Sequence, residues 1–141
     1  PDSKKFYGIK LNRKSGDYDN FDFLLKENDK KYIIYLLRGK KEFPNDLENC
    51  KVYKEKIVDE FKVLFKNLET FDYIHKYQID DGKSVAYITS FRFTDGSVVR
   101  VYCDNWSTVT EKEKGWEDEL NVEISSAEAF LWLNTEAYNQ Q

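Results

Sequence analysis

Two residues of this chain could do acid-base or nucleophilic chemistry, His75 and Cys103. His75 could act as a general base if Asp72, Asp104 or Tyr73 lies beside its imidazole. Cys103 could act as a nucleophile only with that imidazole within hydrogen-bond reach. A histidine among strand tyrosines is more often a structural residue, and we favour that interpretation. The enzymatic or ligand-binding alternative has a pocket around His75, Tyr73, Tyr77 and Cys103.

Other kinds of chemistry find little support in the residue types. One histidine and two separated cysteines do not make a usual zinc site, and the scattered glycines form no phosphate-binding loop. The adjacent acids Asp80 and Asp81 could in principle serve glycoside hydrolysis, but acids in turns are usually solvated. The sequence therefore predicts a protein without metal, cofactor or enzymatic activity.

The stretch "DNWSTVTEKEKGWEDELN" at 104–121 combines two of the three tryptophans with six acids and two lysines. In a structural interpretation, each indole covers an edge of the core while the acids solvate a connecting hairpin. In a functional interpretation, the indoles anchor a protein partner and the carboxylates steer it. The predicted partner-binding residues are Asp104, Trp106, Glu111, Glu113, Trp116, Glu117, Asp118 and Glu119.

Charge decides which partner such a surface would suit. The net charge of −4 divides into +3 for residues 1–70 and −7 for residues 71–141. Eighteen of the 22 basic residues are lysine, although arginine is the residue favoured for phosphate and base contacts. An acidic stretch would also repel a nucleic-acid backbone. We therefore predict a basic protein partner, such as a toxin or nuclease, and no nucleic acid.

Length and composition are typical of one domain, 1–141. No apolar run approaches the roughly 18 residues of a membrane helix, so no membrane partner is expected. Cys50 and Cys103 are isolated in the sequence, and we expect reduced thiols in a cytoplasmic protein. A bridge between them would need Cα atoms within about 7 Å.

Apolar alternation predicts a three-stranded antiparallel meander at 5–11, 21–26 and 31–39. In the first strand, Tyr7, Ile9 and Leu11 share the face that is expected to be buried. The third strand is apolar on both faces, which predicts a central position with cover on each side.

A helix is predicted from Asn45 to about residue 68, with Glu48 at the spacing of a capping box. Its charged residues lie mainly opposite an apolar stripe, which indicates packing against the core. The stripe consists of Ile57, Phe61, Leu64, Phe65 and Leu68.

The second half predicts strands at 71–79, 84–93 and 98–105, joined by two Asp-Gly turns. If both turns have two residues, Tyr77 opposes Ala86, His75 opposes Ile88, and Ile88 opposes Cys103. This register would place the only histidine in an apolar layer.

A last strand is expected at 119–125, followed by a closing helix to about residue 138. Ser125 and Glu128 stand at capping-box spacing. Phe130, Leu133 and Ala137 are predicted on the apolar side of this helix, with Trp132 at its edge.

The order βββ-α-βββ(β)-α predicts an α+β fold, a mostly antiparallel sheet of two meanders with two helices packed on it. In composition and expected architecture, the chain resembles proteins that neutralise a basic nuclease or toxin, such as bacterial immunity proteins and phage-encoded inhibitors. The resemblance implies a non-enzymatic antitoxin that presents carboxylates where the enzyme expects phosphate. A third hypothesis is an accessory domain that self-associates through an exposed strand edge.

Overall fold

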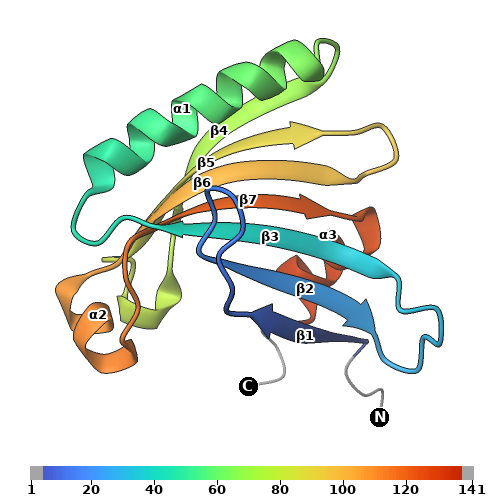
Figure 1. Cartoon of the computed structure of the whole chain (residues 1–141), viewed down its shortest axis with the longest axis horizontal. Coiled ribbons are helices and arrows are strands. Elements are labelled where there is room, and N and C mark those ends of the chain that lie inside the picture. The colour runs from blue at the N-terminus through green and yellow to red at the C-terminus, as the bar shows by residue number, and fades with distance from the viewer. Residues whose placement is uncertain (1–4, 138–141) are drawn as a thin grey trace.

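A computed structural model describes residues 5–137 and has the predicted α+β architecture (Figure 1). Seven strands form one antiparallel sheet in the order β1-β2-β3-β7-β6-β5-β4. The elements are β1 (Phe6–Leu11), β2 (Asn20–Lys26), β3 (Ile34–Glu42), α1 (Leu47–Leu64), β4 (Glu69–Lys76), the 3-10 turn η1 (Gln78–Asp80), β5 (Val85–Arg92), β6 (Val98–Asn105), α2 (Thr108–Lys114), β7 (Glu119–Ser125) and α3 (Ala127–Thr135).

The two predicted meanders are joined into one sheet by the last strand. After β3 the chain crosses along α1 to the far edge, returns through β4, β5 and β6, and inserts β7 between β6 and β3. Strand β7 pairs with both neighbours, for example Val122 with Gly39 on one side and Val101 on the other. The centre of the sheet therefore depends on a contact between segments that are distant in the sequence.

Helix α1 packs its apolar side over β5, β6 and β7. Cys50 and Val58 are buried there, and Phe61 and Phe65 contact the ring of Phe91. The predicted stripe is right except for one residue: Leu64 is 69% exposed. Helix α1 ends at this residue, and Phe65 and Leu68 in the following turn still pack against the core.

The cap of α1 differs from the predicted one by a residue. Asp46, not Asn45, caps the helix, and its carboxylate accepts a hydrogen bond from the backbone N–H of Asn49 at 3.3 Å. Asn45 has a φ of 52° and still belongs to the turn after Pro44. An asparagine tolerates this left-handed conformation better than most residues do. The turn therefore includes Asn45, and the helix begins one residue later than predicted.

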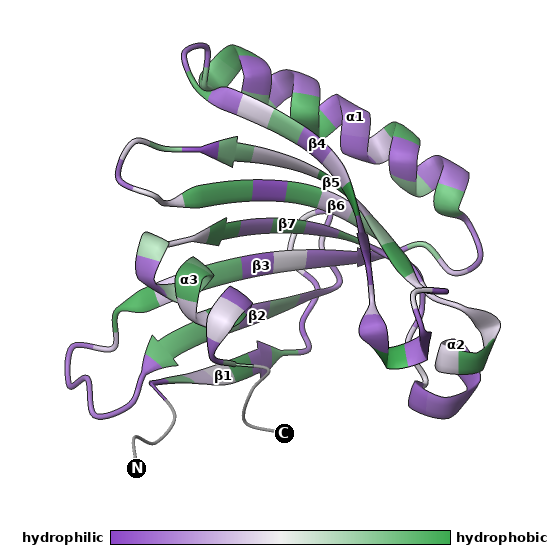
Figure 2. Ribbon diagram, turned by 180° about the vertical axis from the view of Figure 1, so that it is seen from behind, coloured by the Kyte–Doolittle hydropathy of each residue, from purple (hydrophilic) through white to green (hydrophobic). Residues whose placement is uncertain are grey.

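Helix α3 lies on the opposite face of the sheet from α1 (Figure 2). Ala129 is buried against Phe6 and Leu36, and Trp132 lies with its ring centroid 5.3 Å from that of Phe6. The N-cap is Ser126, because the predicted cap, Ser125, is the last residue of β7 and is buried. Residue 138, the predicted end of this helix, lies outside the described residues.

The position of α3 overturns the predicted buried face of β1. Phe6 is 2% exposed beneath α3, whereas Ile9 and Leu11 are 44% and 45% exposed on the other face. The same face is open on β3, where Leu36 is buried but Leu37 is 37% exposed. Cover on both sides of β3 was therefore a wrong expectation, since α1 does not extend over these strands.

Both hairpin registers in the second half differ from the prediction. His75 pairs with Ala86, because η1 lengthens the first connection. Ile88 pairs with Tyr102, because Gly96, at a φ of 86°, ends a three-residue loop in place of a two-residue turn. A shift of one residue moves a side chain to the other face, so Ile88 and Cys103 lie on opposite faces. His75 is exposed on the edge strand β4, not in an apolar layer.

The two cysteines form a disulfide, which corrects the expectation of reduced thiols. Cys50 on α1 and Cys103 on β6 are both fully buried, with Cα atoms 6.1 Å apart. The bond fastens the first turns of α1 to the middle of the sheet. Disulfides are typical of oxidising compartments, and the cytoplasmic location stays a prediction. No helix within residues 5–137 has the length and apolar character to cross a membrane.

Candidate functional site

The segment between β6 and β7 contains a helix that the sequence interpretation took for a hairpin. Ser107 caps α2 by accepting a hydrogen bond from the backbone N–H of Thr110 at 3.3 Å. Gly115, with a φ of 67°, ends it in the left-handed region. Both signals are present in the sequence, a serine before and a glycine after one short charged segment.

A chain of aromatic rings lies beside α2. The ring of Tyr77 stacks on Trp106 with centroids 4.7 Å apart and an interplanar angle of 26°. Trp106 in turn contacts Trp116, again at 4.7 Å. Trp106 is half-buried and Trp116 is 42% exposed. One indole therefore supports the other, and the outer one meets solvent in a fixed position.

The six acids of this segment divide into two groups. Glu113 and Glu117 are exposed and Glu111 is half-buried, whereas Asp104 and Asp118 are buried and Glu119 is half-buried. Asp118 accepts a hydrogen bond from the backbone N–H of Trp106 at 2.8 Å, and burial raises the pKa of its carboxyl. We call the outward group the acidic end, which consists of Glu111, Glu113, Trp116 and Glu117.

The acidic end borders a shallow hollow in the protein surface. Glu111, Trp116 and Glu117 line this hollow of about 190 Å³, which Pro44 and Asn45 close on the other side. The hollow thus brings two of the six predicted carboxylates together with one predicted indole, and Glu113 is exposed on the same helix as Glu111. Asp104, Asp118 and Glu119 point into the protein and do not contribute to this surface.

Asp80, in η1 between β4 and β5, holds the start of α2 in place by hydrogen bonds. Its Oδ2 accepts hydrogen bonds from the hydroxyls of Ser107 at 2.6 Å and Thr110 at 3.0 Å. Its other oxygen accepts the backbone N–H of Ser84 at 2.9 Å. Burial opposes ionisation here, but the hydrogen bonds from Ser107, Ser84 and Thr110 outweigh it and hold the pKa of Asp80 below its ordinary value. These hydrogen bonds therefore fix the position of α2, the helix that contains Glu111 and Glu113 of the acidic end.

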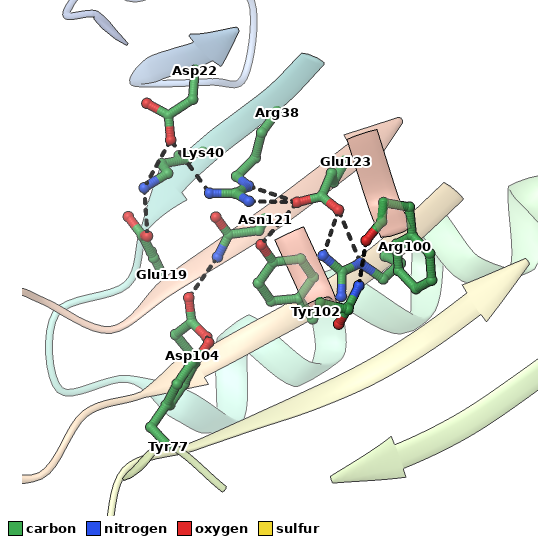
Figure 3. A network of polar contacts seen from close by, with 12 residues as sticks. Asp22, Arg38, Lys40, Tyr77, Arg100, Tyr102, Asp104, Glu119, Asn121 and Glu123 are labelled. Carbon is green, nitrogen blue, oxygen red and sulfur yellow. Dashed lines mark hydrogen bonds and ion pairs between the residues drawn. The ribbon is translucent and has the colours of Figure 1, made fainter. Parts of the chain in front are cut away.

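Asp104 belongs to a polar network on the α3 side of the sheet (Figure 3). It accepts a hydrogen bond from the Tyr77 hydroxyl at 2.6 Å and another from the Asn121 amide at 2.9 Å. Burial raises the pKa of Asp104 to about 7, and the nearby charge of Glu119 acts in the same direction. Glu119 itself pairs with Lys40 at 3.1 Å. Both carboxylates thus have structural partners.

Glu123 is the centre of this network and was not predicted. The residue is fully buried, and its carboxylate accepts hydrogen bonds from Arg38 at 2.6 and 2.9 Å and from Arg100 at 2.9 Å. Burial would raise the pKa of Glu123, but the two guanidinium groups outweigh it and lower the pKa. Figure 3 shows the network crossing β2, β3, β7 and β6. Its sequence signal, charges alternating with apolar residues, is identical to that of a solvated face.

The residues of the enzymatic alternative are not all brought together. Cys103 is in the disulfide on the α1 side, and His75 is exposed on the other side, where its ring meets Tyr77 at 4.9 Å. Tyr73 is 38% exposed on the same edge strand. Among the described residues, no group of three or more His, Cys, Asp or Glu side chains is arranged to hold a metal ion.

A second hollow lies between α1 and strands β4 and β5. It has a volume of about 490 Å³. Lys54 is buried at its base, where the ammonium donates to Thr89 Oγ1 at 2.7 Å and to Glu55 at 3.0 Å. Thr89 donates in turn to Asp72 at 2.6 Å. These groups neutralise one another within the hollow. Lys51, Lys54, Glu55, Asp72, Tyr73, Ile74, Tyr87 and Ile88 line it.

Comparisons of the chain with protein-family models, with curated proteins and with solved structures found no match. A functional assignment therefore depends on the geometry of the surfaces described above.

Proposed function

We propose that this chain is a non-enzymatic inhibitor of the immunity or antitoxin type, which binds a basic protein such as a toxic nuclease through its acidic end. The observation that supports this most directly is Trp116, a large apolar side chain that is 42% exposed and rests on a second indole. Tryptophan is enriched among the residues that contribute most to binding energy at protein interfaces. An indole already held in place loses little conformational entropy when a partner covers it.

The carboxylates around Trp116 give this surface its preference for a basic partner. Glu113 and Glu117 are exposed, and Glu111 and Glu117 border the same hollow as the indole. Lys112 and Lys114 on the same helix are also exposed and offset most of this charge. We therefore assign most of the affinity to Trp116, and the orientation of the partner to the carboxylates.

The experiment that tests the proposal begins with the product of the neighbouring gene and a panel of basic nucleases as candidate partners. Binding of the full chain is measured by surface plasmon resonance, and inhibition by nuclease activity. Trp116→Ala is expected to weaken binding about 30-fold or more, equivalent to about 2 kcal/mol. Leu131→Ala is the matched control, because Leu131 is a 62% exposed apolar residue on α3.

The electrostatic part has its own control. The triple variant Glu111→Lys, Glu113→Lys and Glu117→Lys should slow association several-fold at low salt, and less at moderate salt. The variant Glu27→Lys, Glu69→Lys and Glu136→Lys changes the net charge equally at exposed positions elsewhere. Equal association rates for the two triple variants would remove the acidic end from the proposal. Binding that survives Trp116→Ala unchanged, or no binding to any candidate, would reject it.

A further inference from the structure

Among residues 5–137, nothing covers about half of the α1 side of the sheet. A row of directly paired residues crosses four strands from Ile9 through Phe23 and Leu37 to Ile124. Ile9 is 44%, Leu37 37% and Ile124 53% exposed, and Phe23 is half-buried. In Figure 1 no helix lies in front of β1, β2 and β3. We call this surface the open face: Ile9, Leu11, Phe21, Phe23, Leu37 and Ile124.

The open face has the composition of a protein interior. The residues that share this side of β1, β2 and β3 along the paired rows are all uncharged between Tyr7 and Gly39. The charged residues of the same strands, such as Lys10, Asp22 and Arg38, occupy the other side. A contiguous exposed apolar surface of roughly a few hundred Å² is comparable to the largest apolar patch on a typical monomer, and such a patch is often functional.

Tyr18 and helix α1 border the open face on one side. Tyr18, in the loop between β1 and β2, lies over Gly39, where an added Cβ would come within 2.9 Å of the tyrosine ring. The ring of Tyr18 also contacts Phe21 at 5.8 Å. Helix α1 lies beyond the loop, and Leu64, which is 69% exposed, follows Ile57 by two turns on this flank. A partner would therefore settle beside α1 in the layer that the helix already occupies.

We propose that a second copy of this chain covers the open face and forms a two-fold symmetric dimer. Two sheets stack about 10 Å apart, a spacing close to the thickness of a helix layer, so the partner's β1–β3 would fill the space beside α1. A two-fold axis brings each surface against itself, which suits an uncharged surface. A basic partner would instead require carboxylates, and the open face has none.

The extent of the open face sets the expected affinity. Four strands by three alternate residues cover about 15 Å in each direction, or a few hundred Å², against about 800 Å² per partner in a standard interface. The neighbouring exposed residues Leu64, Tyr32 and Ile34 must therefore contribute at the margin. We expect a dissociation constant of about 10 µM.

Sedimentation velocity of the full chain between about 2 and 400 µM tests the dimer. The wild type is expected to change from monomer to dimer over this range. Leu37→Lys and Ile124→Lys should each weaken the dimer at least tenfold, because each places an ammonium in a dry interface. Val52→Lys and Leu131→Lys are the matched controls, since both residues are exposed apolar positions on helices, and they should stay within twofold of wild type.

Each alternative outcome overturns the proposal. A wild-type chain that stays monomeric at about 400 µM has no such dimer, even if another protein binds the open face. A dimer that resists both lysine substitutions uses a different surface, such as the free edge of β1 or β4. Urea denaturation at low protein concentration checks that each variant is folded. Nuclease binding through the acidic end is measured separately, so the two proposals can fail independently.

Discussion

The α1 side of the sheet has a packed half and an open half that are built from the same kinds of residue. In the packed half, Phe91, Val101 and Leu120 are fully buried beneath α1. In the open half, Leu37 and Ile124 keep 37% and 53% of their surface in contact with solvent. The boundary runs along β7, where Leu120 is covered and Ile124 is not. Apolar alternation thus shows that a face is suited to burial without showing what buries it.

The size of α1 explains the boundary. A helix with its side chains is about 10 Å wide, whereas strands lie about 4.8 Å apart, so one helix covers two or three strands. The sheet has seven strands, and the only other long helix in the described chain, α3, lies on the reverse side. The open half therefore needs a second layer, which we assign to another copy of the chain.

The two halves should differ most in the free energy of unfolding that is lost when an apolar side chain is truncated to alanine. Phe91→Ala should lower the free energy of unfolding by about 3–5 kcal/mol, because Phe61 and Phe65 cannot fill the cavity that it leaves. Leu37→Ala in the open half should cost less than about 1 kcal/mol. Urea denaturation at about 0.1 µM protein, about a hundredth of the expected dissociation constant of the dimer, gives both values for the monomer. Equal costs would mean that the open half is packed within the monomer.

The polar network tests whether the two halves unfold together, since it crosses their boundary on the reverse side. Glu123→Gln leaves the guanidinium groups of Arg38 and Arg100 without their carboxylate and should cost about 3 kcal/mol. Glu119→Gln is the control, because the Glu119 to Lys40 pair is more exposed. Fluorescence should report one transition. Separate transitions of Trp132, which packs against Phe6 of β1, and Trp106, which follows β6, would show independent halves.

The disulfide belongs to the packed half alone. The double substitution Cys50→Ser and Cys103→Ser opens a loop of 53 residues and should lower the free energy of unfolding by about 3 kcal/mol. Hydrogen exchange should quicken most in α1, while the amides of β1 and β2 change little. The wild type in a strong reductant should behave like the double variant. Unchanged stability in both would show that the bond contributes nothing to holding α1.

The smallest predicted effect concerns pH. The pKa of Asp104 is raised to about 7 in the folded protein, so between about pH 4 and pH 7 the folded chain holds a proton that the unfolded chain has released. Stability therefore falls as the pH rises through this window. The full linkage is about 4 kcal/mol, and we expect about 2 kcal/mol after relaxation of the neighbouring groups.

Denaturation curves at pH 4.5 and pH 8 measure this loss. Asp104→Asn removes the contribution of this carboxyl and should make the profile flatter, while Asp118 and Glu119, whose pKa values burial also raises, keep a slope in the same sense. Glu123 and Asp80, whose pKa values are lowered, act in the opposite sense and only at lower pH, where their carboxylates become protonated. A wild-type profile that rises between pH 4.5 and pH 8 would contradict the placement of Asp104.

Local signals in the sequence predicted most elements but not their exact ends. Asn45 and Asp46 are both good caps, and the structure uses the second. The "TDGS" turn fits a two-residue or a three-residue loop, and the three-residue loop around Gly96 moved Ile88 to the opposite face from Cys103. One residue of uncertainty in a loop was enough to separate His75 from Cys103, the two residues that the enzymatic alternative needs together.

The predicted partner-binding residues divide between the surface and the interior of the protein. Glu113, Trp116 and Glu117 reach solvent, but Asp104 and Asp118 turn inward to hydrogen-bond donors of Tyr77, Asn121 and Trp106. No sequence pattern separates a carboxylate that meets water from one that meets a distant hydroxyl.

The sequence by itself determined the α+β class, the antiparallel strands and the apolar side of α1, because these depend on residues that are close together in the sequence. Only the tertiary structure decided that β7 joins the two meanders, that Glu123 is buried between two arginines and that Cys50 meets Cys103. Each of these contacts joins segments far apart in the chain. Their free energy depends on distances that alternation and helical spacing do not contain.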